Sequence, residues 1–182
     1  MQNPFTTTFS KTPEYTYIDT EKAEEILENF SYDSPSESVY KITGVRGSGK
    51  TVLLAKIEEE LRSGIYKADN WLIFDVNPTR DILGQIAAML VKEGFGGKTK
   101  SGTGVNLSAT VLGTGGGFGF SSEKNMEFFD IGVEVENMIQ QVQKKNKKIL
   151  IGIDEVSKSD EMVKFASEYG RWLRAGYPVY FV

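Results

Sequence analysis

The sequence predicts an α/β fold in which helices cover a mostly parallel β-sheet. Two observations carry this prediction. Segments with apolar residues at helical spacing alternate with short apolar runs, and residues 70–76 and 148–153 are almost continuously apolar. Continuous apolar runs are typical of parallel strands whose two faces are both covered by helices. We expect residues 1–182 to form a single domain, because this length allows one hydrophobic core.

The first part of the chain, residues 1–37, is expected to form an extended leading segment and a first helix. Residues 1–20 are rich in threonine and contain two prolines, which disfavour regular structure. Apolar residues at helical spacing predict a helix over about 21–30, capped by Thr20. Turn residues end this helix, and a short strand is predicted over about 38–43.

The stretch Gly44–Thr51 reads Gly-x-x-x-x-Gly-Lys-Thr and lies between the expected strand and an apolar-periodic helix. This is the P-loop pattern with a strand before it and a helix after it. Gly44 and Gly49 are expected to let the backbone wrap tightly, so that its N–H groups point at a phosphate. The N-terminus of the following helix also favours an anion. The motif therefore predicts a nucleotide-binding site.

Individual roles follow from this pattern. Lys50 would reach the β- and γ-phosphate oxygens of a nucleoside triphosphate, and the Thr51 hydroxyl would ligate Mg²⁺. The expected nucleotide-binding residues are Gly44, Val45, Arg46, Gly47, Ser48, Gly49, Lys50, Thr51 and Val52. The helix that opens at the motif is predicted to run to about Arg62, where a Ser-Gly pair ends it.

The middle of the chain is predicted to hold a strand, a helix and a glycine-rich insertion. Strand 70–76 leads into a helix that Thr79 or Asp81 opens and that ends near Gly94. More than half of the 19 glycines lie within residues 94–122, where an alternating run predicts a β-hairpin. We expect this stretch to be a flexible insertion into the domain.

The last third of the chain continues the alternation. Helices are predicted over about 124–145 and 158–175, and strands over about 148–153 and 177–182. Lysines that gather at the end of the first of these helices are expected to be partners of its dipole, the alternative being a nucleic-acid patch. The chain stops in an apolar strand, whereas termini are normally solvated, so we expect the domain to be incomplete at its C-terminus.

Asp154 and Glu155 directly follow the apolar strand 148–153, which is the Walker B pattern. Ligands bind at the carboxyl ends of the strands in open α/β sheets, so both carboxylates are expected beside the P-loop. Asp154 would hold Mg²⁺ through water, and Glu155 would polarise the attacking water. The predicted catalytic residues are Glu155 and Lys50, and the predicted metal ligands are Thr51 and Asp154. Together the motifs predict the three-layer sandwich of a P-loop NTPase, with the glycine-rich hairpin inserted.

Composition narrows the available chemistry. The chain has no Cys and no His, which excludes disulfides, thiol nucleophiles, Ser-His-Asp triads and zinc sites with those ligands. The carboxylates, lysines, arginines and hydroxyls that remain are the groups of a Mg²⁺–phosphate site. The net charge of −4 gives no general attraction to nucleic acid. Because no apolar run has the length of a membrane span and no signal pattern begins the chain, we expect a cytoplasmic protein without a membrane partner.

The two motifs, Gly44–Thr51 and Ile149–Glu155, resemble those of AAA-type ATPases, in particular the archaeal and bacterial group related to origin-recognition ATPases and the signal-transducing STAND ATPases. Residues 8–13 resemble that group's N-terminal motif, which lies against the adenine. The resemblance implies that strand 177–182 lies between the P-loop strand and the Walker B strand. It also implies a sensor residue, a fifth strand, an arginine finger and a helical lid beyond the end of this chain.

An arginine finger can contribute about 10³–10⁵ in rate, so the resemblance implies low ATPase activity for this piece alone. Arg46, Arg171 and Arg174 are the arginines that could be proposed for that role, although arginines on helices are usually surface residues. A homo-oligomer and a DNA or protein partner are expected only by analogy with the family.

The favoured function is Mg²⁺-dependent ATP binding and hydrolysis that drives a conformational change of a partner or assembly. The alternative is a nucleotide-dependent signalling switch with little or no turnover. A P-loop kinase is disfavoured because no Arg-rich lid segment follows a helix. A GTPase is disfavoured because the chain has no Asn-Lys-x-Asp guanine motif. We therefore expect ATP and Mg²⁺ as the cofactors.

Overall fold

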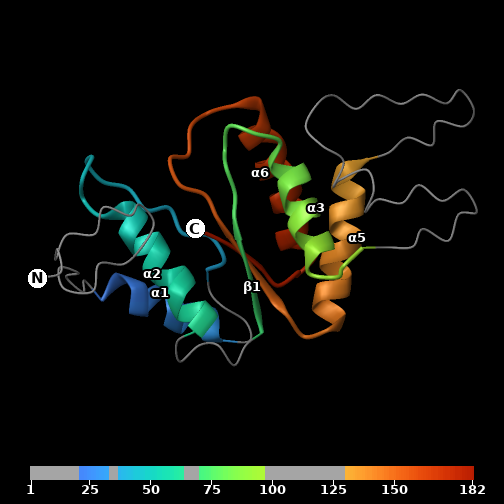
Figure 1. Ribbon diagram of the computed structural model, residues 1–182, viewed down its shortest axis with the longest axis horizontal. Coiled ribbons are helices and arrows are strands. Elements are labelled where there is room, and N and C mark those ends of the chain that lie inside the picture. The colour runs from blue at the N-terminus through green and yellow to red at the C-terminus, as the bar shows by residue number, and fades with distance from the viewer. Residues whose placement is uncertain (1–20, 33–36, 64–69, 97–129) are drawn as a thin grey trace, which may run out of the picture.

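The computed structural model describes residues 21–32, 37–63, 70–96 and 130–182 (Figure 1). Within these ranges the helices and strands follow the predicted order, except that the strand predicted over 38–43 is reduced to a single bridge. The helices are α1 (Lys22–Ser31), α2 (Lys50–Ser63), α3 (Ile82–Lys92), α5 (Ile131–Lys144) and α6 (Asp160–Arg174). The strands are β1 (Trp71–Asp75), β2 (Lys148–Gly152) and β3 (Val179–Phe181). The predicted α/β class is confirmed.

The three strands form a parallel sheet in the order β1–β2–β3. An extended segment continues the sheet beyond β3, where Val39 forms an isolated parallel bridge with Phe181. The Tyr40 N–H donates to the Phe181 carbonyl at 2.9 Å, and the Phe181 N–H donates to the Ser38 carbonyl at 2.9 Å. β3 therefore lies between β2 and the segment that leads to residue 44, which is the order that the AAA-type resemblance implied.

The strand predicted over residues 38–43 is reduced in the structure to this single bridge at Val39. Its neighbour β3 is only three residues long, so it can pair with only the first part of the segment. Lys41 and Thr43, further along, are exposed. The chain thus enters the P-loop motif from an extended segment rather than from a full strand.

Helices cover both faces of the sheet, with α1 and α2 on one side and α3, α5 and α6 on the other (Figure 1). Successive side chains of β2 alternate between the two layers. Ile149 and Ile151 belong to the larger core formed with α3, α5 and α6, whereas Leu150 belongs to the smaller core formed with α1 and α2. All three side chains are fully buried, as the continuous apolar run predicted for a strand covered on both faces.

An aromatic cluster closes the smaller core. Phe30 of α1 is fully buried, and its ring centroid lies 5.5 Å from that of Tyr40, 5.8 Å from that of Trp71 and 4.8 Å from that of Tyr180. The Lys148 Nζ donates to the Phe30 carbonyl at 3.0 Å. These contacts attach α1 to all three strands and to the segment before the P-loop motif.

The structure corrects the predicted start of one helix. α5 begins at Ile131, later than the predicted start at about 124, because the Asp130 side chain caps it there by accepting the N–H groups of Gly132 at 2.8 Å and Val133 at 3.4 Å. α1 follows Glu21, which adopts a left-handed backbone and makes no side-chain capping bond. The predicted cap, Thr20, lies outside the described residues.

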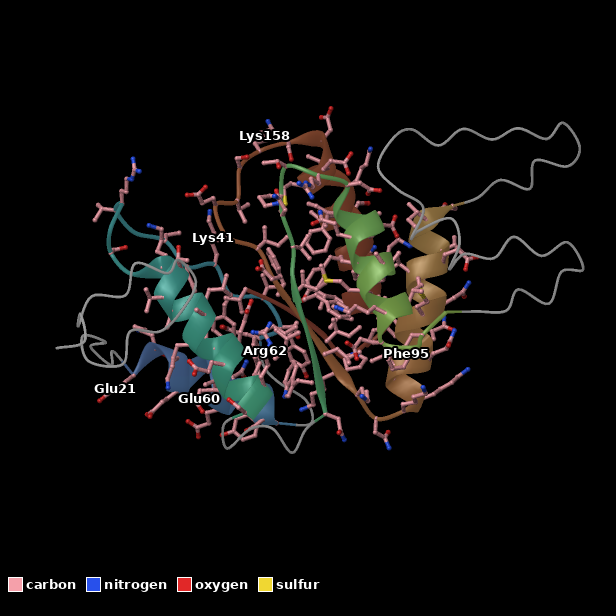
Figure 2. All side chains as sticks on the ribbon, in the orientation of Figure 1. Glu21, Lys41, Glu60, Arg62, Phe95 and Lys158 are labelled. Atoms are coloured by element: carbon pink, nitrogen blue, oxygen red, sulfur yellow. The ribbon has the colours of Figure 1, made fainter. Side chains whose placement is uncertain are left out.

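Most of the glycine-rich stretch 94–122, including the predicted hairpin, lies outside the described residues, as does the N-terminal motif at 8–13. Its first residues are described. Gly94 turns the chain with a φ of 83°, and Phe95 is 1% exposed in the larger core, beside the ends of α3 and α5 (labelled in Figure 2). In the described part of the chain, no helix has the length and apolar character needed to cross a membrane.

Candidate functional site

The loop of residues 44–49 joins the extended segment to the N-terminus of α2. Gly47 and Gly49 have φ values of 82° and 85°, left-handed conformations that glycine adopts without steric cost. Gly44 has a different role, because a Cβ added there would lie 2.7 Å from the Ser48 Oγ. The tight turn predicted for Gly44 and Gly49 is therefore formed by Gly47 and Gly49, whereas Gly44 leaves room for the side chain of Ser48.

Lys50, the first residue of α2, folds its side chain back over this loop. Its Nζ donates to the carbonyl oxygens of Gly44 at 3.1 Å and Val45 at 2.9 Å. The loop faces solvent, and Val45 is 79% exposed. An anion that approaches the loop would therefore meet an ammonium group and the positive end of a helix dipole together.

Thr51 and Asp154 bring the two predicted halves of the site together. Thr51 lies in the first turn of α2, and Asp154 follows the end of β2. The Thr51 Oγ1 donates to the Asp154 Oδ2 at 2.6 Å, across 103 residues of sequence. The carboxyl end of β2 and the start of the P-loop helix are thus in direct contact.

The donors at this contact suit Mg²⁺, which prefers oxygen ligands. The described residues contain no group of three or more His, Cys, Asp or Glu side chains that could hold a metal ion. Mg²⁺ does not require such a group, because it keeps several waters and binds through one or two protein ligands together with substrate phosphates. One hydroxyl and one carboxylate beside a phosphate loop fit this ion.

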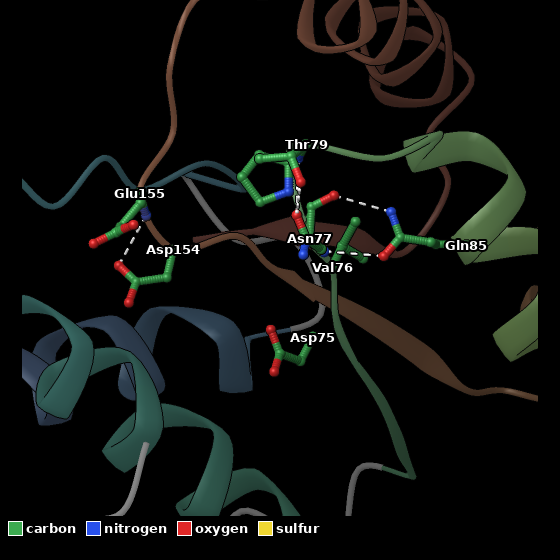
Figure 3. Close-up of a pocket in the computed structure, with 8 residues that line it drawn as sticks. Asp75, Val76, Asn77, Thr79, Gln85, Asp154 and Glu155 are labelled. Atoms are coloured by element: carbon green, nitrogen blue, oxygen red, sulfur yellow. Dashed lines mark hydrogen bonds between the residues drawn. The ribbon is translucent and has the colours of Figure 1, made fainter. Parts of the chain in front are cut away.

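Glu155 has a φ of 56°, which is uncommon for a residue other than glycine. Its N–H donates to the Asp154 Oδ1 at 2.9 Å (Figure 3). The Asp154 carboxylate therefore uses one oxygen for Thr51 and the other for the Glu155 backbone. The Glu155 side chain is exposed. Backbone strain of this kind is frequent at functional sites.

A cavity of about 430 Å³ opens at the carboxyl ends of β1 and β2 (Figure 3). It is lined by Asp75, Val76, Asn77, Pro78, Thr79, Gln85, Asp154 and Glu155. Gln85 of α3 holds one wall, because its Oε1 accepts the Asn77 N–H at 3.0 Å and its Nε2 donates to the Asn77 carbonyl at 2.9 Å. Sequence reasoning did not assign Asn77 and Gln85 to the site. The available signal was a polar turn directly after a buried strand.

Glu58 is a second residue that sequence reasoning missed. It lies in α2, is 8% exposed and contacts Gly152 of β2, where an added Cβ would lie 2.6 Å from its Oε1. The Arg62 Nη1 lies 3.3 Å from its Oε2. Burial raises the pKa of Glu58, against the lowering effect of Arg62, and the charge of Asp75 raises it further. The sequence signal is an acidic residue within the apolar stripe of a helix.

The other charged residues considered from the sequence lie in ordinary surroundings. Arg171 forms ion pairs with Glu136 at 2.9 Å and Glu168 at 2.8 Å, between α5 and α6. Arg46 and Arg174 are exposed. In the lysine cluster, Lys145 lies 4.5 Å from the centroid of the Phe95 ring. These contacts give Arg171 and Lys145 structural roles.

Comparison with known families matches residues 20–164 to the KAP family P-loop domain. The matched range includes the loop at 44–51 and the pair Asp154 and Glu155. The search of curated proteins and the search of solved structures found no match.

Proposed function

Because this chain belongs to the KAP family of P-loop domains, a family of nucleotide-binding NTPases, we propose that it binds ATP with Mg²⁺ and hydrolyses it. Family membership supports nucleotide binding, and we add to it the adenine base, the metal and turnover as proposals. The observation that carries it is the 2.6 Å hydrogen bond between Thr51 and Asp154. It joins a hydroxyl at the phosphate loop to a carboxylate at the end of a parallel strand, the pair that a Mg²⁺–triphosphate complex needs.

Residues 44–52 bind the phosphates in this proposal. Backbone N–H groups of the loop and of the first turn of α2 donate to phosphate oxygens. Lys50 exchanges its two carbonyl contacts for phosphate oxygens, because a charge-assisted hydrogen bond between two ions is stronger than one to a neutral carbonyl. Thr51 and Asp154 would hold Mg²⁺, which neutralises phosphate charge when bound.

Glu155 acts as the base that orients and polarises the attacking water in this proposal. A second candidate function, a nucleotide-dependent switch with little or no turnover, is favoured by one observation. The Glu155 side chain is exposed, and within the described residues no hydrogen bond to its carboxylate is seen. A base that is not held in place accelerates hydrolysis poorly.

The strand order supports the narrower AAA-type assignment, because β3 lies between β2 and the segment of Val39. On that assignment the ATPase drives a conformational change of a partner or an assembly. A homo-oligomer and a DNA or protein partner are proposed by analogy with such ATPases. A cytoplasmic location is proposed from the sequence alone.

Calorimetric titration with ATP and GTP, with and without Mg²⁺, tests this proposal. We expect wild type to prefer ATP and to bind it more tightly with Mg²⁺. Lys50→Ala should lose at least about tenfold in affinity, because it removes charge-assisted hydrogen bonds to phosphate.

Lys56→Ala is the matched control. Lys56 lies on the same helix but pairs with Glu60 at 2.6 Å, so its loss should leave nucleotide affinity unchanged. If Lys50→Ala binds ATP as tightly as wild type does, the assignment of residues 44–52 as the phosphate-binding site is wrong. Tighter binding of GTP than of ATP would contradict the proposal that the bound base is adenine.

A further inference from the structure

α2 contacts the segment directly after β2 at one point and β2 itself at another. At the first, the Thr51 hydroxyl donates to Asp154. At the second, the carboxyl group of Glu58 contacts Gly152. Residues seven apart on a helix lie two turns apart on one face, and residues two apart on an extended chain share a face. One face of α2 therefore contacts one face of the chain at residues 152–154 in two places. Thr51 makes the contact at the candidate metal site, and Glu58 makes the contact two turns further along the helix.

The second contact allows little freedom. A Cβ at Gly152 would lie 2.6 Å from the Glu58 Oε1 and 3.3 Å from the Leu54 Cδ1. Glu58 is 8% exposed, and Arg62 holds its other oxygen at 3.3 Å. Asp75 pairs with Gly152 in the register of β1 and β2. The carboxyl group is therefore enclosed between its own helix and the strands beneath it.

We propose that Glu58 is a positioning residue for the metal site: its carboxyl group, seated on Gly152, sets the spacing between α2 and β2 and so holds the Thr51 hydroxyl against Asp154. This inference rests on the proposed function. Mg²⁺ requires near-ideal octahedral geometry with ligands at about 2.0–2.1 Å, so a small displacement of α2 from β2 changes metal binding. The phosphate loop and Lys50 precede this contact and bind phosphate without it.

The test is the ratio of ATP dissociation constants without and with Mg²⁺, measured by calorimetry. Gly152→Val should reduce this ratio about tenfold, which is typical for the loss of a group that orients metal ligands. ATP affinity without Mg²⁺ should be unchanged. The double variant Glu58→Ala with Gly152→Val should restore the ratio, because the valine side chain occupies the volume that the carboxyl group leaves.

Two control variants test whether the effect comes from the shape of the Glu58 side chain, from its charge, or from any substitution on α2. Glu58→Gln keeps the shape of the side chain and should retain the wild-type ratio. Glu60→Ala, on the same helix but paired with Lys56, should also retain it. If Gly152→Val does not fold, Glu58→Ala alone serves as the test, because loss of the spacer should lower the ratio where Glu58→Gln does not.

The proposal is overturned if Gly152→Val and Glu58→Ala keep the wild-type ratio, or if the double variant does not restore it. These outcomes leave the proposed function standing, provided that wild type shows ATP binding strengthened by Mg²⁺. Wild type without such strengthening would overturn the proposed function, and the positioning role with it.

Discussion

Gly47 and Gly49 take the left-handed backbone conformations of the phosphate loop, while Gly44 accommodates the close approach of Ser48. The sequence pattern names the first and last glycines of the motif, but it does not say which of them needs a positive φ. That depends on how the loop turns into α2, where the Ser48 N–H donates to the Val45 carbonyl at 3.2 Å. Residue types were therefore predictable here, whereas their individual conformations were not.

At the same scale, Glu155→Gln tests hydrolysis against the switch. The variant should bind ATP as wild type does, because Glu155 is placed outside the phosphate loop. Its turnover should fall by about 10²–10⁴, the usual contribution of a general base. The measurement is phosphate release in a single turnover.

Glu161→Gln provides the control for that variant, since Glu161 is a nearby acidic residue that pairs with Lys164 at 2.9 Å. It should hydrolyse at the wild-type rate. Equal rates in wild type and Glu155→Gln would favour the nucleotide switch.

At the scale of elements, the capping residue rather than the apolar periodicity determines where α5 and α6 begin. The apolar spacing that predicts α5 has no marked beginning, and the start that it predicts, at about 124, is too early. In the structure Asp130 adopts an extended backbone and satisfies two N–H groups that the helix leaves free. α6 likewise starts after Ser159, whose Oγ accepts the Met162 N–H at 3.2 Å.

Asp130→Ala should lower the free energy of unfolding by about 1 kcal/mol, the usual effect of removing an N-cap. Urea unfolding followed by circular dichroism would measure it, with an unchanged m-value as the sign that the compactness of both states is kept. Asp130→Ser is the matched control, because serine also accepts hydrogen bonds at this position. An equal loss in both variants would contradict a capping role.

At the scale of the whole molecule, β2 organises the structure. Its alternate residues reach both helical layers, and its carboxyl end carries Asp154 beside α2. The burial of Glu58 follows from this arrangement, because α2 lies directly over Gly152. A buried carboxyl group at that contact makes the stability of the fold depend on pH.

Burial raises the pKa of Glu58 above its ordinary value of 4.5. The folded state therefore binds more protons than the unfolded state between the two pKa values, and its stability falls as the pH rises through that interval. Glu58→Gln removes this titration. The variant should differ little from wild type below pH 4.5 and should be more stable than wild type at about pH 7.

Urea unfolding of both proteins across this pH range would show the difference growing with pH. The exposed neighbour Glu59 gives a matched control, and Glu59→Gln should not reproduce that growth. A difference between Glu58→Gln and wild type that stays constant with pH would contradict the linkage.

The sequence by itself determined the α/β class, the approximate places of the described helices and strands, and the two motifs. These features follow from local properties: helical and extended periodicity, and the residue types that a phosphate loop needs. It also placed strand 177–182 between its neighbours through the AAA-type resemblance.

Only the tertiary structure decided which residues meet across the layers. The contacts of Thr51 with Asp154 and of Glu58 with Gly152 join α2 to β2 from distant parts of the chain. The reduction of the segment at Val39 to a single bridge depends on the length of a strand near the other end of the sequence. Such contacts are set by how helices pack on the sheet, and no local pattern records that packing.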